Sequence, residues 1–163
     1  MTWGNRMDRI TVIMPENENE IKDFSATADD YIIWGAGRAA AITMLPLPIA
    51  DIGALMANEA YMIYRIAETY GYDIDSSIVS MLTATVGGTF TRRLLFSLVP
   101  ILKIPIAAGI TYAMGKVAKV YFASGMTMSR EALRIEFTQA RRKANRIDWY
   151  SKEPIDVQEE ILS

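Results

Sequence analysis

Mainly apolar segments alternate with short polar or proline-containing ones along the chain, and this pattern predicts five long helices. Residues 10–15 form a β-prone run, but no second strand is available to pair with it, so we expect a docking arm or tail. The predicted fold class is all-α: a bundle of four core helices as two hairpins, plus an amphipathic C-terminal helix and polar tails. The expected ranges of the five helices and of a short sixth one are 27–44, 49–70, 76–99, 106–124, 127–145 and 155–162.

The limits of the first helix are predicted from its flanking residues. The acidic segment 16–20 is typical of a solvated linker, and Thr27 with Asp30 three residues later has the spacing of a capping box. Pro46 and Pro48 are expected to end this helix, because proline lacks a backbone donor and restricts the residue before it.

The next boundaries rest on single residues. Asp51 follows the two prolines, and its side chain can cap the second helix; a partner contact and a catalytic role are the alternatives. Gly71 is a natural C-cap for the same helix. We expect Pro100 and Pro105 to bound a tight link between the third and fourth helices.

Small residues recur every four positions in the third and fourth predicted helices. This spacing lets helix backbones approach closely, inside bundles or bilayers, so we expect these two helices to lie backbone to backbone. Gly35–Gly37 and Gly87–Gly88 fall within helical patterns and are interpreted as close packing rather than phosphate-binding loops. The recurring small residues are Ser80, Ala84 and Gly88, then Thr83, Gly87 and Thr91, and in the fourth helix Ala107, Thr111 and Gly115.

The predicted C-terminal helix has a heptad-like apolar seam on one face. This seam packs either on the protein's own bundle or on a partner helix, including that of a second copy. Leu133 and Phe137 are the candidate contact residues in the second case. The whole seam consists of Met126, Leu133, Phe137, Ala140, Ala144 and Ile147.

The 163 residues contain neither Cys nor His. Disulfides, the usual zinc, haem and iron–sulfur sites, and Ser-His-Asp or Cys-His mechanisms therefore lack necessary residues. Acid–base catalysis near neutral pH would need a carboxylate, Lys or Tyr with a strongly shifted pKa. We expect no enzyme activity, no catalytic residue, no cofactor and no metal.

The net charge of −2 hides a segregation along the chain. Residues 128–146 carry six basic and two acidic side chains, whereas residues 1–30 and 147–163 each carry four more acidic than basic side chains. Such alternation favours contact between tails and bundle, or with another copy. Because the chain is acidic overall, nucleic acid is not an expected partner.

The basic cluster of Arg141, Arg142, Lys143 and Arg146, followed by Trp149, is the best candidate surface site. A solvated helix end is one interpretation, since basic groups suit the C-terminal helix dipole. Binding to an anionic membrane surface, with the aromatic side chain at the interface, is the other.

No stretch of the chain has the roughly 20 apolar residues of a spanning helix. The longest run without a charged residue covers positions 76–91. A soluble or peripheral bundle is the favoured interpretation, and shallow hairpin insertion into a bilayer is the alternative. The start of the chain lacks a long apolar core, so we expect no secretory signal and a cytoplasmic protein, with inner-membrane association as an option.

Part of the chain resembles the YcjF-type helical domain of unknown function, which accompanies bacterial GTPases. The resemblance covers residues 28–125. Glu59 stands where the family usually has Gln, and Ile106 where Gly is common. The matching residues are Pro46–Asp51, Leu55, Met62, Ile66, Tyr70–Gly71, Lys103–Pro105, Gly109, Gly115, Tyr121–Phe122 and Gly125.

The resemblance implies a non-enzymatic helical adaptor that works with a GTPase at or near the inner membrane. The GTPase is expected to be another protein, because these residues contain no Gly-x-x-x-x-Gly-Lys-Ser/Thr loop. The alternative is a self-assembling scaffold, or a coat- or compartment-associated protein, that uses the seam. The expected parts are an N-terminal arm with an acidic linker, a GTPase-associated-type bundle, an amphipathic basic helix and an acidic tail, over 1–27, 28–125, 126–150 and 151–163.

Overall fold

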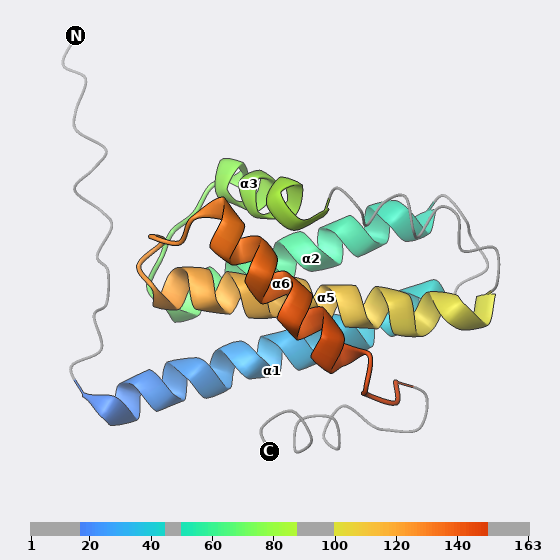
Figure 1. Cartoon of the computed structure of the whole chain (residues 1–163), viewed down its shortest axis with the longest axis horizontal. Helices are drawn as coiled ribbons and strands as arrows, with labels where there is room; N and C mark the ends of the chain where they lie inside the picture. Colours follow the sequence, from blue (N-terminus) through green and yellow to red (C-terminus); the bar gives the residue numbers. More distant parts are fainter. Residues whose placement is uncertain (1–16, 45–49, 88–99, 150–163) are drawn as a thin grey trace, which may run out of the picture.

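A computed structural model describes residues 17–44, 50–87 and 100–149 of the protein (Figure 1). Every regular element in these ranges is a helix, so the all-α prediction is confirmed. The expected features at 10–15, at 88–99 and at 155–162, together with Pro46 and Pro48, lie outside the described residues. The helices are α1 (Glu18–Thr43), α2 (Ala50–Thr69), α3 (Ser76–Gly87), α5 (Pro100–Ala123) and α6 (Arg130–Ala144).

The first helix begins nine residues before Thr27, and the expected solvated linker is helical from Glu18 onward. Asn17 is the N-cap, because its side-chain Oδ1 accepts hydrogen bonds from the backbone N–H groups of Asn19 and Glu20, both at 3.0 Å. Glu18 and Glu20 lie in the first turn, where the helix dipole favours negative charge. The capping-box prediction at Thr27 was wrong because acidic residues suit a first turn as well as a linker.

The predicted link between Pro100 and Pro105 is also wrong, because α5 runs through both prolines. Pro100 occupies the first position of the helix, where a missing N–H has no intrahelical partner to lose. Pro105 lies in the second turn, where it removes one intrahelical hydrogen bond. The helix therefore extends six residues further toward its N-terminus than expected.

Glycine ends two of the helices through the same hydrogen-bonding motif. Gly71 has a φ of +78°, its N–H donates to the Glu68 carbonyl, and the Tyr72 N–H donates to the Ala67 carbonyl, each at 2.9 Å. This is a Schellman motif, and glycine adopts its left-handed conformation without a Cβ clash. The predicted cap at Gly71 is confirmed, and Gly125 (φ +71°) ends α5 in the same way.

The central element is α5, whose most extensive contacts are with α1, followed by α6 and α2. Figure 1 shows α6 crossing α5 diagonally, with α3 at the upper edge of the bundle, above the start of α6. α1 and α2 pack together as the first predicted hairpin. Over Ser76–Gly87 α3 has only limited contact with α5, so the expected backbone-to-backbone pairing is not observed there, and the rest of the expected third helix lies outside the described residues.

The small residues of α5 serve a different interface from the one expected. A Cβ at Gly115 would lie 2.6 Å from Ile32 Cγ1 of α1 and 3.0 Å from Met62 Sδ of α2. A Cβ at Gly35 of α1 would lie 2.7 Å from the same sulfur atom. Glycine at both positions therefore lets α1, α2 and α5 meet around Met62, which is fully buried. None of the described helices combines the length and apolarity that crossing a bilayer requires.

Candidate functional site

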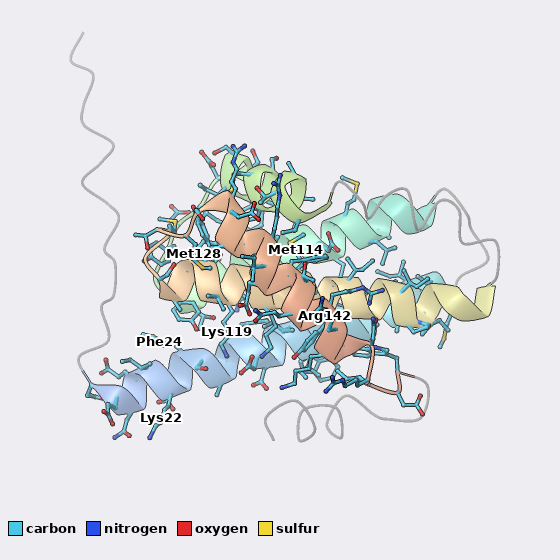
Figure 2. The ribbon with its side chains drawn as sticks, viewed as in Figure 1. Lys22, Phe24, Met114, Lys119, Met128 and Arg142 are labelled. Atoms are coloured by element: carbon cyan, nitrogen blue, oxygen red, sulfur yellow. The ribbon has the colours of Figure 1, made fainter. Side chains whose placement is uncertain are left out.

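The predicted basic cluster lies at the C-terminal end of α6. Arg142, Lys143 and Arg146 are exposed there, and Figure 2 shows Arg142 on this helix. Arg141 points back onto α5, where its Nη1 occupies the space that a Cβ at Gly109 would fill. The structure thus places three of the four predicted cations on one surface and uses the fourth in helix packing.

Trp149 is partly buried and packs against the core. Its indole Nε1 donates a hydrogen bond to the Ala144 carbonyl at 3.2 Å, and its ring centroid lies 6.2 Å from that of buried Tyr112. Burial raises the pKa of the Tyr112 hydroxyl, and the charges of Asp29 and Glu136 add to this shift. The Trp149 side chain is thus partly buried against the core, and the prediction that it accompanies the cations at an interface stays a prediction.

The apolar seam of α6 packs on the protein's own bundle. Leu133 is fully buried, and Phe137 packs against the same core. Ala140, Ala144 and Ile147 are buried beside them. Of the two arrangements left open by the sequence, the intramolecular one is observed, so a partner helix could reach Leu133 only after α6 moved.

Asp51 lies in the first turn of α2. Its side chain is outside the described residues, so its predicted role as a cap stays a prediction. Another polar residue of this helix, Arg65, contacts a neighbouring helix.

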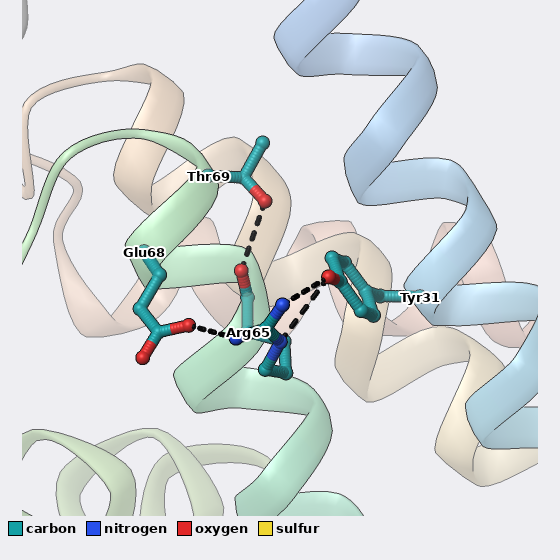
Figure 3. A network of polar contacts seen from close by, with 4 residues as sticks. All are labelled: Tyr31, Arg65, Glu68 and Thr69. Atoms are coloured by element: carbon teal, nitrogen blue, oxygen red, sulfur yellow. Dashed lines mark hydrogen bonds and ion pairs between the residues drawn. The ribbon is translucent and has the colours of Figure 1, made fainter.

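Arg65 joins α2 to α1 (Figure 3). Its Nε and Nη2 donate to the hydroxyl oxygen of Tyr31 at 3.1 and 2.6 Å, and its Nη1 lies 2.5 Å from Glu68 Oε2. The Thr69 hydroxyl donates to the Arg65 carbonyl at 2.9 Å. Because the Arg65–Glu68 pair is substantially exposed, we attribute the contact between the helices to the Tyr31 hydrogen bonds.

A second polar connection joins the same two helices further along. Asn58 Nδ2 of α2 donates to the Gly35 carbonyl of α1 at 2.9 Å, and Asn58 Oδ1 accepts from Arg38 Nε at 2.8 Å. The Arg38 guanidinium carbon lies 5.3 Å from the ring centroid of Tyr61. These contacts fix the arginine, yet its buried Nη2 has no hydrogen-bond partner among the described residues.

Large apolar side chains are exposed beside this arginine. Trp34, one turn before Arg38 on α1, is 55% exposed, and Tyr61 of α2 is 52% exposed. We call Trp34, Arg38 and Tyr61 the α1–α2 seam. Nothing in the sequence pattern distinguishes these two aromatics from core residues, because both lie within mainly apolar helices.

A buried ionic group ties α1 to α5. Asp29 Oδ1 accepts from Lys116 Nζ at 2.7 Å, and Asp29 Oδ2 accepts from Lys119 Nζ at 2.6 Å. Figure 2 shows Lys119 at this interface. Desolvation lowers the pKa of Lys119, and the hydrogen bond to Asp29 opposes that shift. Burial, aided by the Asp29 charge, raises the pKa of neighbouring Tyr70 to about 12.

The sequence pattern alone did not bring Asp29, Lys116 and Lys119 together. A signal was present, because α5 contains two lysines three residues apart and no acidic residue of its own. If such a helix is buried, its lysines need a carboxylate from another element.

Glu59 is a buried carboxyl without a salt-bridge partner in the described part of the chain. Its side chain is 2% exposed, and it lies near Thr111 of α5. Desolvation raises its pKa from 4.5 to about 7, and the nearby Thr111 hydroxyl opposes the shift. Neither Glu59 Oε1 nor Thr111 Oγ1 has a hydrogen-bond partner of normal geometry among the described residues.

The groups around Asp29, Arg65 and Asn58 are thus arranged as connections between helices. No three acidic side chains within residues 17–44, 50–87 and 100–149 gather closely enough to hold a metal ion. The positions with binding capacity are at the surface: the exposed cations of α6 and the α1–α2 seam.

Comparison with known proteins places the chain in a family. No family model matches it, and no solved structure does so either. It is similar to magnetosome membrane protein 22 of Magnetospirillum gryphiswaldense, with 30% identity over 145 residues, which cover 77% of this chain and 69% of that protein. Identity at this level across most of both chains shows that the protein belongs to the family of magnetosome membrane protein 22.

Proposed function

We propose that this protein is a non-enzymatic, membrane-associated helical module that acts by binding. The observation that carries the proposal is its similarity to a protein named for the magnetosome membrane. An all-α bundle with exposed cations on α6 and exposed aromatics on α1 and α2 is consistent with attachment to a bilayer surface.

The interior supports a binding role rather than a catalytic one. Asp29 is engaged with two lysines, Arg65 with Tyr31, and Asn58 with Gly35. These groups hold helices together, so they are not available as an acid, base or nucleophile without disturbing the bundle. Burial raises the pKa of Glu59 to about 7, but this side chain is 2% exposed, so a substrate could reach it only through the same disturbance.

A GTPase partner is the finer part of this proposal. It rests on the resemblance of residues 28–125 to the YcjF-type domain. Crosslinking in the native organism, followed by identification of the captured proteins, tests it. A GTP-binding protein among the specific partners supports the adaptor role, and its consistent absence removes that role while leaving membrane association intact.

Vesicle flotation of the full 163-residue chain tests the membrane part. We expect the protein to rise with vesicles that contain anionic phosphatidylglycerol, because the exposed cations of α6 and Arg38 favour a negative surface. Protein that stays at the bottom of the gradient with both anionic and zwitterionic vesicles contradicts the proposal.

A further inference from the structure

The α1–α2 seam exposes the kinds of side chain that favour a membrane–water interface. Trp34 and Tyr61 are each more than half exposed although both rings have large apolar areas. Tryptophan and tyrosine are enriched at the level of lipid headgroups, because the ring is apolar and the N–H or O–H stays hydrated. Two further exposed apolar side chains, Met44 and Met56, belong to the same two helices or their ends.

Arg38 is held in place between these helices before any ligand binds. Its Nε donates to Asn58, and its guanidinium lies over Tyr61. Its Nη2 is itself buried, so a headgroup would meet the partly exposed remainder of the side chain. A positively charged guanidinium is well suited to phosphate.

The charge pattern around the seam favours an anionic surface. Arg38 is the single charged residue between positions 31 and 50. Between positions 52 and 64 the single charged residue is Glu59, which is turned into the core. Apart from Asp51, which separates these two segments at the start of α2, no acidic side chain there opposes the approach of negatively charged headgroups.

The end of α6 differs from the α1–α2 seam, because its cations are exposed and its neighbouring apolar side chains are not. Its cations Arg142 and Arg146 are exposed, but Trp149 and Ile147 beside them pack inward. The exposed apolar side chain of α6, Ile135, lies two turns before Arg142, so the cations at the end of the helix attract a membrane mainly through screened electrostatics. A basic surface of this kind assists docking, whereas stable attachment needs apolar burial as well.

We infer that the α1–α2 seam is the surface that docks on an anionic lipid bilayer, with Trp34 and Tyr61 entering the headgroup region and Arg38 binding lipid phosphate. This inference rests on the proposed membrane association and deepens it by naming the face and the lipid chemistry. The exposed cations of α6 add long-range attraction.

Co-sedimentation of the full chain with vesicles tests the inference. We compare the wild type with the double variant Trp34→Ser/Tyr61→Ser, using vesicles of phosphatidylcholine with and without phosphatidylglycerol. The matched control is Ile135→Ser, which removes an equally exposed apolar side chain (53%) from α6. Circular dichroism verifies that the wild type and the two variants are equally helical.

We expect the double variant to bind anionic vesicles about tenfold more weakly than the wild type, and Ile135→Ser to bind like the wild type. If the double variant binds like the wild type, or if Ile135→Ser loses as much binding, the α1–α2 seam is not the docking surface. Membrane association itself is not contradicted by either result. Equal binding of the wild type to both vesicle types overturns the preference for anionic lipid. Failure of the wild type to bind either vesicle removes the proposed function itself.

Discussion

The two faces of α1 differ in how far their polar and aromatic side chains are buried and bound to other residues. Toward α5, Asp29 has both carboxylate oxygens bound to lysines, and packing is close enough to require Gly115. On the side of the α1–α2 seam, Trp34 is more than half exposed, and Arg38 is partly exposed beside Tyr61 of α2. The comparison separates groups that build the fold from groups that remain available for binding.

Breaking the ionic group should have the largest effect on stability. Asp29→Asn leaves Lys116 and Lys119 buried without a countercharge, so we expect the free energy of unfolding to fall by about 3 kcal/mol. Urea denaturation of the variant measures this loss. Asp23→Asn, which neutralises an exposed carboxylate of the same helix, is the control and should change stability by less than about 0.5 kcal/mol.

Glu59 is a polar group inside the bundle whose Oε1 has no hydrogen-bond partner among the described residues. It tests how a buried carboxyl without such a partner affects stability. Its folded-state pKa of about 7 exceeds the ordinary 4.5, so the folded protein holds this proton more tightly than the unfolded chain does. Stability linked to this group is therefore complete below about pH 4.5 and declines as the pH rises to 7.

The variant Glu59→Gln cannot ionise and should lack that decline. At pH 8 we expect it to be more stable than the wild type by up to about 3 kcal/mol, and at pH 4.5 the two should differ little. Denaturation at both pH values measures the difference. An equal difference between the two proteins at pH 4.5 and pH 8 would show that Glu59 titrates normally.

Gly115 tests how closely α1, α2 and α5 pack together. Gly115→Ala introduces a Cβ that meets Ile32 and Met62, so we expect a loss of about 1–2 kcal/mol in thermal or urea denaturation. A Cβ at Gly53 of α2 would meet no atom within 4 Å. Gly53→Ala should therefore stabilise the protein by about 0.5–1 kcal/mol through helix propensity. The same sign for both substitutions would contradict the packing.

The smallest stability effect is expected on the outer face. Trp34→Ser removes a side chain that is more than half exposed, so the free energy of unfolding should change by less than about 0.5 kcal/mol. Urea denaturation checks this value. A loss of about 2 kcal/mol or more would assign Trp34 to the core instead of to a binding surface.

Sequence patterns predicted helix type better than helix limits and partners. Periodicity and Gly71 placed α2 to within a residue at either end, because a glycine cap is a local signal. The start of α1 was missed because Asn17 and the glutamates after it are compatible with both linker and first turn. Pro105 was given too much weight, since a proline in an early turn removes a single hydrogen bond.

The candidate site depended on long-range contacts that periodicity does not encode. The basic residues of α6 were correctly expected on one helix, but the inward turn of Trp149 follows from its hydrogen bond to the Ala144 carbonyl. Likewise, Asp29 and Lys119 are 90 positions apart in sequence and meet only because α1 packs on α5. The exposure of Trp34 follows from the same packing, which leaves that face of α1 uncovered.

Quenching of tryptophan fluorescence by brominated lipids tests the contrast most directly. Two variants each retain one of these tryptophans: Trp3→Phe/Trp149→Phe retains Trp34, and Trp3→Phe/Trp34→Phe retains Trp149. With anionic vesicles that contain brominated acyl chains, we predict strong quenching of Trp34 and little quenching of Trp149. Strong quenching of Trp149 with Trp34 unaffected would contradict the assignment of the α1–α2 seam as the face that contacts the membrane.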